Sequence, residues 1–390
     1  MSTTRRQPTG VLLAFSLAWS GGYIAYTPFL TLLLPIRFTE LAGAADRDWL
    51  ALSATLGAIA AGLSNILWGW LSDRYKPRKA WFGAGLVLTA IACALIWRAT
   101  TPAATIAAVV AWQTALNMLL GPLAAYFADS VPDEQKGAFG GLLVLGPASA
   151  ALSILGVALV PPSLEARLAM IMAVVAFCVV PLLLIRRVEP IAAEVGPEKV
   201  DDSTTAAPTL VGLWVVRLVV QVAEGLLFLF VYYLLRERSG GDLSVAGYAL
   251  TNAAVQLISV PIALTLGRLS DRTGRRKWPL VAMLAMVTLG LAGMAVTADW
   301  WLTVACYGLF LTGSNSFLAL HSTFAMQKLP NPRHYGRDLG FFNLTNTLPS
   351  LTTPVLAVMV VGQFGYSGLL LGLAVTMFIP AAILIRLRLD

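Results

Sequence analysis

The sequence predicts an all-α integral membrane protein whose twelve spanning helices form two parallel six-helix repeats. Three observations support this fold class. The chain of 390 residues has a mean hydropathy of +0.77 and only 12% charged residues, about half the charge that is usual in a soluble domain. Apolar runs of spanning length recur along the chain, and one charged stretch occurs twice, half a chain length apart.

The apolar runs define the predicted spans. A helix that crosses the hydrocarbon core needs roughly 20 mainly apolar residues. The backbone groups must also be satisfied internally, which favours helices, because the alternation typical of a membrane barrel is absent. The predicted spans are 9–36, 48–72, 79–98, 102–128, 136–159, 164–186, 209–236, 244–270, 277–297, 299–328, 337–361 and 364–386.

One long polar connection interrupts this pattern. It reads RRVEPIAAEVGPEKVDDSTTAAPT, contains three prolines and is otherwise polar, acidic and small. Such a composition is typical of a flexible linker. The predicted domains are therefore an N-terminal six-helix half over 1–186, a cytoplasmic linker over 187–208 and a C-terminal six-helix half over 209–390.

The positive charges predict the orientation. With the N-terminus inside, cytoplasmic segments carry twenty Lys and Arg residues and outer segments carry six. This bias places both termini, the linker and the repeated stretch in the cytoplasm. The basic pI of 9.5 therefore reflects membrane orientation, and we expect no nucleic-acid partner.

The repeated stretch reads GWLSDRYKPRKAW over 69–81 and GRLSDRTGRRKW over 267–278. Each copy joins the second and third helices of a six-helix half, so both repeats have the same direction. The pattern G-x-L-S-D-R-x-x-x-R-K resembles the signature loop of the major facilitator superfamily. The first copy departs from it at Lys76 and Pro77, where the family has a glycine and an arginine. The resemblance covers essentially the whole chain and implies a transporter that alternates access by rocking two halves.

The resemblance also implies a role for this loop as a cytoplasmic latch. The glycines allow close helix approach, and each aspartate can face the N-terminus of another helix, which favours an anion. By analogy, Asp73 meets the start of helix 11 near 336–338, and Asp271 meets the start of helix 5 near 136–137. The alternative is that the loop is only a topology signal. The predicted latch residues are Gly69, Asp73, Arg74, Gly267, Asp271, Arg272 and Arg276.

Glu224 is the acid placed deepest in a predicted span. It lies near mid-membrane when measured from either end of helix 7, where a charged carboxylate costs at least a few kcal/mol. It is therefore the first candidate for proton coupling. The alternative is a carboxylate held permanently by a cation or by hydroxyls. His321 is the second candidate, as a proton relay, against the alternative of a neutral core histidine.

Helix 7 carries further polar residues on the face of Glu224. Arg217, Gln221 and Phe228 follow helical spacing with it. Arg217 lies about 10 Å towards the cytoplasm. It can bind an anionic solute group, or it can extend to the interface.

The resemblance implies that helices 1, 4, 7 and 10 line the central cavity. These helices and their neighbours carry uncharged donors, acceptors and aromatic rings, which suit a polyhydroxylated solute. Such a lining would also accept a nucleoside or an amphipathic drug. The predicted substrate-binding residues are Tyr23, Thr27, Trp112, Gln113, Asn117, Arg217, Gln221, Phe228, Asn252, Gln256, Asn315 and Asn343.

These features predict a proton-coupled symporter of a sugar-like or other small polar solute. The end of helix 1, YTPFLTLLLP, resembles that of sugar–cation symporters. The alternatives are a proton-coupled exporter of amphipathic compounds and a uniporter in which Glu224 is structural. An enzyme or receptor is disfavoured, because the sequence has no nucleotide loop, no HExxH and no matched nucleophile and base. We expect no cofactor and no metal, a monomer, and a plasma or bacterial inner membrane location with the solute, protons and the bilayer as partners.

Overall fold

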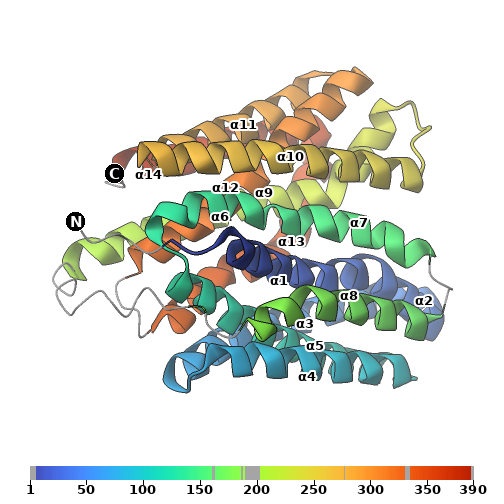
Figure 1. Ribbon diagram of the computed structural model, residues 1–390. Coiled ribbons are helices and arrows are strands. Elements are labelled where there is room, and N and C mark those ends of the chain that lie inside the picture. The colour runs from blue at the N-terminus through green and yellow to red at the C-terminus, as the bar shows by residue number, and fades with distance from the viewer. Residues whose placement is uncertain are drawn as a thin grey trace. The chain divides into compact units, whose positions relative to one another are not determined.

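The computed structural model describes residues 6–159, 163–185, 188, 203–275, 277–329 and 334–387. Most of these residues are helical, and none of them lies in a strand (Figure 1). Within them, eleven helices are long and apolar enough to cross a membrane. The remaining predicted span, the eleventh over 337–361, falls inside a long helix, α13, some of whose side chains lie outside the description. The predicted all-α membrane fold is therefore confirmed.

The first half of the chain contains the helices of the first six predicted spans. The first span is made of α1 (Thr9–Pro28), a π-helical turn (Phe29–Leu33) and α2 (Leu34–Ala42), and a 3-10 turn (Gly43–Ala45) follows it. The next helices are α3 (Asp46–Arg74), α4 (Arg78–Arg98), α5 (Pro102–Ser130), a 3-10 turn (Asp133–Gln135), α6 (Lys136–Leu143), α7 (Leu145–Leu159) and α8 (Leu164–Leu184).

The second half begins with α9 (Ser203–Arg238). The remaining helices are α10 (Val245–Thr273), α11 (Lys277–Val296), α12 (Trp300–Lys328), α13 (Tyr335–Thr376) and α14 (Phe378–Arg386). Helix α13 covers the eleventh span and the start of the twelfth, with a kink at Gly365, where φ is +65° and ψ is −175°. Glycine tolerates this backbone conformation because it has no Cβ.

Several helices begin at a capping side chain. The Asp299 carboxylate accepts from Leu302 N at 2.8 Å, and the Ser244 hydroxyl accepts from Gly247 N at 3.0 Å. Thr101 and Ser163 cap their helices in the same way. Each cap satisfies an N–H group that has no partner inside the helix and is worth about 1 kcal/mol. The caps therefore fix the starts of α5, α8, α10 and α12.

The chain divides into two compact units. Unit 1 comprises Met1–Pro132, Leu145–Lys199 and Asn331–Thr347, and unit 2 comprises Asp133–Val144, Val200–Pro330 and Leu348–Asp390. In unit 1, α5 packs against α3 and α4, α1 packs against α7 and α8, and α4 packs against α8. In unit 2, α12 packs against α10 and α11, α9 packs against α14, and α11 packs against α14. The two units thus repeat one packing pattern.

The compact units differ from the predicted halves in two places. Helix α6 belongs to unit 2 although it lies in the first half of the sequence, and the start of α13, up to Thr347, belongs to unit 1. The chain changes unit between α6 and α7, two residues before Pro147. Because proline has no N–H to bond the carbonyl of Leu143, the helix is interrupted at this point.

The boundary of the predicted linker needs a correction. Helix α9 begins at Ser203, so residues 203–208, assigned to the linker from their small and polar side chains, are helical. The stretch opens with Ser and Thr, which is typical of a helix start. Residues 189–202 lie outside the described part of the chain. The division into two six-helix halves itself stays a prediction.

Candidate functional site

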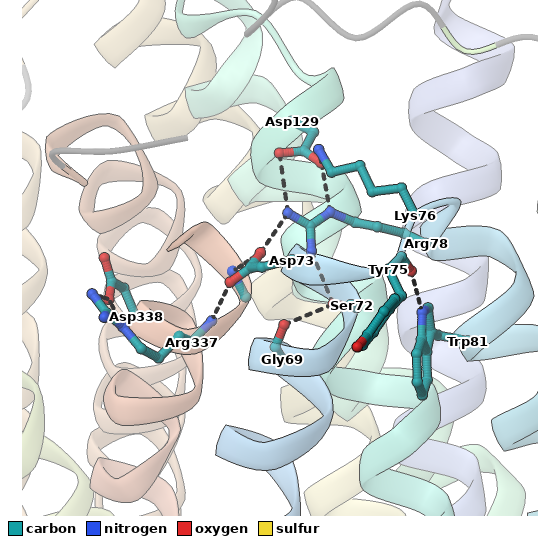
Figure 2. A network of polar contacts seen from close by, with 11 residues as sticks. Gly69, Ser72, Asp73, Tyr75, Lys76, Arg78, Trp81, Asp129, Arg337 and Asp338 are labelled. Atoms are coloured by element: carbon teal, nitrogen blue, oxygen red, sulfur yellow. Dashed lines mark hydrogen bonds and ion pairs between the residues drawn. The ribbon is translucent and has the colours of Figure 1, made fainter. Parts of the chain in front are cut away.

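The first repeated loop places a carboxylate at the start of another helix. Asp73, at the end of α3, accepts hydrogen bonds from Gly336 N and Arg337 N, both at 2.9 Å (Figure 2). These two N–H groups belong to the first turn of α13 and have no partner inside that helix. The contact lies within unit 1 and confirms the predicted partner of Asp73.

The second loop makes the same contact within unit 2. Asp271, near the end of α10, accepts from Gly137 N at 2.9 Å and from Ala138 N at 2.6 Å. These are the first free N–H groups of α6. Hydrogen bonds to a charged group contribute about 1.5–3 kcal/mol each, and the positive end of the helix dipole adds to them. The predicted partner of Asp271 is therefore confirmed as well.

Paired glycines make both contacts possible. A Cβ on Gly69 would overlap the carbonyl oxygen of Gly336, and a Cβ on Gly336 would overlap that of Gly69. In unit 2, a Cβ on Gly267 would overlap the carbonyl oxygen of Gly137. The clashing atoms are backbone atoms, so a side-chain movement would not relieve the overlap. The helices can approach this closely only because glycine stands at the crossings.

The basic residue of the first loop, Arg78, lies between two acids. Its Nη2 is 2.8 Å from Asp73 Oδ1, and its Nε is 2.5 Å from Asp129 Oδ2 (Figure 2). Its Nη1 donates to Ser72 Oγ at 2.9 Å. Arg78 is only 3% exposed, so the guanidinium and both carboxylates form a buried ionic cluster. Asp129 ends α5 and was predicted only as a gate or interface charge, because nothing in its local sequence indicates a partner on α4.

The other latch residues differ in what they contact. Arg74 is exposed and its guanidinium carbon lies 5.7 Å from the centre of the Tyr75 ring. Arg272 is also exposed. Arg276, the counterpart of Arg78 in the repeat, lies outside the described residues. Neither Arg74 nor Arg272, the described arginines of the L-S-D-R sequence, is part of the buried cluster. The sequence pattern alone does not distinguish these exposed arginines from the buried Arg78.

The predicted coupling residue Glu224 lies on α9 in unit 2 and is partly buried. Its carboxylate lies beside the hydroxyl of Ser314 on α12, which has no other hydrogen-bond partner among the described residues. Within those residues Glu224 forms no ion pair. The carboxylate therefore stands near mid-span with a hydroxyl as its neighbour, a group that can donate to its charged form or accept from its neutral form.

Arg217 is held by a different part of α12. Its Nη1 donates to Ser322 Oγ at 2.7 Å and to the carbonyl of Leu318 at 3.2 Å. The two turns of α9 between Arg217 and Glu224 keep the charges apart, as the sequence predicts. Arg217 thus ties α9 to α12 through neutral acceptors.

The other predicted residues of α9 and α12 have varied surroundings. His321 is completely buried, and its ring lies 5.4 Å from that of Phe317. Gln221 is partly buried. Phe228 lies within α9, but its side chain is outside the described residues. The relay role of His321 and the solute contacts of Gln221 and Phe228 stay predictions.

Three predicted binding residues lie close together between α10 and α12. Tyr307 Oη donates to Asn252 Oδ1 at 2.8 Å, and Asn315 Nδ2 donates to Gln256 Oε1 at 2.5 Å. Asn252 and Gln256 are one turn apart on α10, and both are partly buried. Ser314, beside Glu224, precedes Asn315 on α12. Unit 2 therefore gathers the three amides between α10 and α12, and Tyr307, which bonds one of them, lies within electrostatic reach of Glu224 on α9.

The predicted binding residues of unit 1 include two aromatic side chains that pack against other aromatic rings. Tyr23 packs against Trp19 and Tyr26, with ring centres 6.1 and 5.3 Å apart. Thr27 and Gln113 are partly buried. Trp112 is only 1% exposed, and its ring centre lies 4.7 Å from that of Phe29.

Two predicted amides have local partners. Asn117 is 4% exposed, accepts from Asn65 Nδ2 and donates to the carbonyl of Gln113, both at 2.9 Å. Asn343 accepts from Asn346 Nδ2 at 2.7 Å within α13. Trp112 and Asn117 are enclosed by protein, which leaves their side chains almost no surface for a solute to contact. Both residues lie in a helix that was expected to line the cavity, and their sequence positions do not indicate that they are buried.

The described residues include no group of three or more His, Cys, Asp or Glu side chains that could hold a metal ion. The described site offers a carboxylate, amides and hydroxyls. These groups can bind a polar solute and exchange a proton.

Comparisons with known proteins agree with this architecture. Comparison with curated protein sequences gives no significant match. The human organic anion transporter TETRAN has a solved structure that aligns with a TM-score of 0.74 at 17% identity, over 97% of this chain and 100% of that chain. A bacterial homologue of the iron transporter ferroportin, in an outward-facing state, aligns with a TM-score of 0.74 at 15% identity, over 97% and 98%.

The E. coli fucose:proton symporter FucP aligns with a TM-score of 0.70 at 15% identity, over 96% of this chain and 97% of that chain. Identities this low show a shared fold. The sequence model of the Major Facilitator Superfamily matches twice, over residues 11–235 and 213–390. The two matches span nearly the whole sequence and agree with the repeated loop and the repeated packing, so this chain belongs to the Major Facilitator Superfamily of membrane transporters.

Proposed function

We propose that this transporter is a symporter that couples the entry of protons through Glu224 to the uptake of a sugar-like or other small polar solute. The observation that carries the proposal is the position of Glu224. It is a carboxylate well inside α9, a helix that carries a candidate membrane span, beside the Ser314 hydroxyl and without an ion pair among the described residues. A structural acid would be held permanently by a cation or by several hydroxyls, whereas Ser314 offers Glu224 a single hydroxyl.

The coupling follows from the cost of charge in this environment. A proton on Glu224 removes the charge, and loss of the proton restores it, so the carboxyl favours different surroundings in its two states. Ser314 can hydrogen-bond to either state after rotation of its hydroxyl. Arg217, held by Ser322 and Leu318, contributes a positive field without a direct bond to the carboxylate.

A neutral polar solute fits the groups that accompany Glu224. Asn252, Gln256 and Asn315 are uncharged amides, and such groups hydrogen-bond hydroxyls without requiring an ionic partner. The fold shared with a fucose:proton symporter supports the same class of solute.

The orientation and the latch belong to the same proposal. The excess of Lys and Arg in alternate connections supports a plasma or bacterial inner membrane location with both termini in the cytoplasm. The Asp73 and Asp271 contacts would then lie on the cytoplasmic side and favour the outward-open state. We propose that the chain works as a monomer, with only the solute, protons and surrounding lipid as partners.

Proton flux in proteoliposomes tests the coupling. The purified protein is reconstituted with an internal pH-sensitive dye, and neutral sugars, nucleosides, organic acids and amphipathic cations are added in turn. We expect one class of neutral polar solutes to cause proton entry. Glu224→Gln, which removes the titratable group but keeps the size, should reduce that entry to the rate of empty liposomes.

Glu237→Gln is the matched control, because Glu237 lies on the same helix but is exposed near its end. It should leave the flux unchanged. Equal flux in wild type and Glu224→Gln would make Glu224 structural and overturn the coupling. Proton exit driven by amphipathic compounds would support an exporter instead, and solute uptake without proton movement would support a uniporter.

A further inference from the structure

Each of the two units contains an asparagine at the same position of the repeat. Asn117 on α5 and Asn315 on α12 are separated by the same offset that relates Asp73 to Asp271. Both are buried, at 4% and 6% exposure. Each forms a side-chain hydrogen bond to an amide on the neighbouring helix, Asn65 on α3 in one case and Gln256 on α10 in the other.

Asn117 and Asn315 differ in what remains to be bonded. In unit 1, both ends of the Asn117 side chain are used, by Asn65 Nδ2 and by the carbonyl of Gln113. In unit 2, Asn315 gives only its Nδ2, to Gln256 Oε1. Among the described residues, Asn315 Oδ1 and Gln256 Nε2 have no hydrogen-bond partner. Neither atom is fully enclosed by the protein.

A third side-chain amide, that of Asn252, is also bonded at one end only. Asn252, one turn before Gln256, accepts from the buried hydroxyl of Tyr307 through its Oδ1. Its Nδ2 has no partner among the residues that the structure describes. Turning over both amides of the Asn315–Gln256 pair would exchange its ends, yet one donor and one acceptor would still remain. The open hydrogen-bonding capacity therefore does not depend on how those two amides are assigned.

We propose that Asn252, Gln256 and Asn315 form an open amide triad that binds one uncharged, polyhydroxylated solute. This inference rests on the proposed transport function and assigns its solute class to unit 2. The amide groups of Asn252 and Gln256 donate to oxygen atoms of the solute, and Asn315 accepts from a solute hydroxyl. In unit 1, Asn117 is bonded at both ends and holds α3 against α5.

The chemistry of the triad selects the solute. A hydroxyl both donates and accepts, so a polyol satisfies two donors and one acceptor at once. The two donors are one helical turn apart, about 5–6 Å between Cβ atoms, a distance that a single monosaccharide ring can bridge. A charged head group would leave water without gaining a counter-charge from any of the three amides, which is unfavourable.

Tyr307 is a positioning residue in this arrangement. Its hydroxyl holds the carbonyl end of Asn252, which directs the amide nitrogen away from Tyr307. Without the hydroxyl, the Asn252 side chain can rotate. Solute binding must then fix its conformation, which costs part of the binding free energy. Its effect should therefore appear in affinity and not in the maximal rate of transport.

Ligand-induced stabilisation in detergent tests the triad. Thermal unfolding of the full-length protein is followed with D-glucose, D-galactose, L-fucose and myo-inositol, and with tetraphenylphosphonium and p-aminohippurate as charged probes. We expect neutral polyols to raise the unfolding temperature and charged probes to leave it unchanged, because only a ligand of the folded state stabilises it. Gln256→Leu and Asn252→Ala should each raise the apparent Kd of the best polyol about tenfold.

Unit 1 supplies the matched control. Asn117→Leu removes an amide from the same position of the repeat, so it should lower the unfolding temperature without ligand but change the polyol Kd less than about twofold. Tyr307→Phe should raise the KM for transport severalfold at unchanged kcat. A deoxy analogue of the polyol lacks one hydroxyl and should bind wild type more weakly. If that hydroxyl contacts one amide of the triad, substitution of that amide should not weaken binding of the analogue any further.

Three outcomes would overturn the triad: an unchanged polyol Kd in both Gln256→Leu and Asn252→Ala, an equal loss in Asn117→Leu, or stabilisation of wild type by charged probes alone. Binding in detergent requires no proton gradient, so it is separable from coupling. If wild type binds polyols but never moves protons with them, the coupling proposal fails and the triad stands. If polyols drive proton entry but bind normally to the triad variants, the triad fails and the coupling stands.

Discussion

The two copies of the repeated loop differ most in their charges. Both copies direct an aspartate at the first turn of another helix, at 2.6–2.9 Å, and both cross that helix at paired glycines. In unit 1, a second carboxylate, Asp129, joins the cluster through Arg78. At the same offset, the position of Asp129 is taken in unit 2 by Gln327, which donates to the carbonyl of Asp133 at 3.0 Å.

This difference separates the residues that the helix contact needs from the residues that only balance a buried charge. The glycine and the aspartate are needed wherever a helix end must meet another helix closely, and both copies keep them. The second acid is an addition of unit 1, where it balances a buried guanidinium. Unit 2 reaches the same backbone geometry with a neutral side chain in that place. The contact between the aspartate and the helix start therefore does not require a second carboxylate at this position.

Loss of the buried cation should have the largest effect. Arg78→Met leaves Asp73 and Asp129 buried near each other without their shared partner, so we expect stability to fall by about 3–5 kcal/mol. The measurement is thermal or denaturant unfolding in detergent. Arg74→Met, at an exposed position, is the control and should change stability by less than about 1 kcal/mol.

A second substitution shows whether charge causes that loss. Asp129→Asn in the Arg78→Met background removes one uncompensated carboxylate and imitates the neutral Gln327 of unit 2. We expect it to restore part of the lost stability. If the double variant is less stable than Arg78→Met by the full cost of Asp129→Asn alone, Asp129 and Arg78 do not act as a pair.

The glycine crossings should respond equally in the two units. Gly69→Ala and Gly267→Ala each insert a methyl group against a backbone carbonyl, which should cost about 1–3 kcal/mol. The same unfolding assay measures both variants. Gly156→Ala is the control, because a Cβ there meets nothing within 4 Å, and it should be neutral or slightly stabilising. A loss confined to Gly69→Ala would mean that the two crossings are not equivalent.

The exposed member of the cluster should contribute least. Lys76 Nζ lies 3.7 Å from Asp129 Oδ2, but its side chain is 56% exposed. Lys76→Gln should therefore lower stability by less than about 1 kcal/mol. The loss should disappear in high salt, which screens exposed charges. An unfolding temperature as low as that of Arg78→Met would show that Lys76, and not Arg78, balances the two acids.

Much of the fold could be predicted from the sequence, because spanning helices are set by local length and hydropathy. The partners of Asp73 and Asp271 were also predictable, since the repeated loop and its family resemblance indicate them. The pairing of Arg78 with Asp129 was not, because it joins α4 to α5 through the rotation of each helix about its axis. A helix that is apolar on all sides gives little information about that rotation.

The candidate site shows the same limit. Glu224 could be selected because a mid-span acid is expensive and therefore rare. Asn117 and Asn315 could not be told apart, since the same residue stands at the same repeat position with polar residues nearby. Only the structure shows that Asn117 is bonded at both ends and Asn315 at one. The burial of Trp112 against Phe29 was equally absent from the local pattern.

The membership of residues 331–347 in unit 1 has a consequence for how the protein is made. When the ribosome has completed the first six helices, Asp73 and the crossing at Gly69 still lack their partner, which is synthesised 263 residues after Asp73. Unit 1 is thus completed only when the eleventh helix enters the membrane. Until then, the buried ionic cluster has one carboxylate without its backbone donors. A chain that stops after the tenth helix would leave the earliest part of the protein unfinished, so truncation near the end damages the beginning.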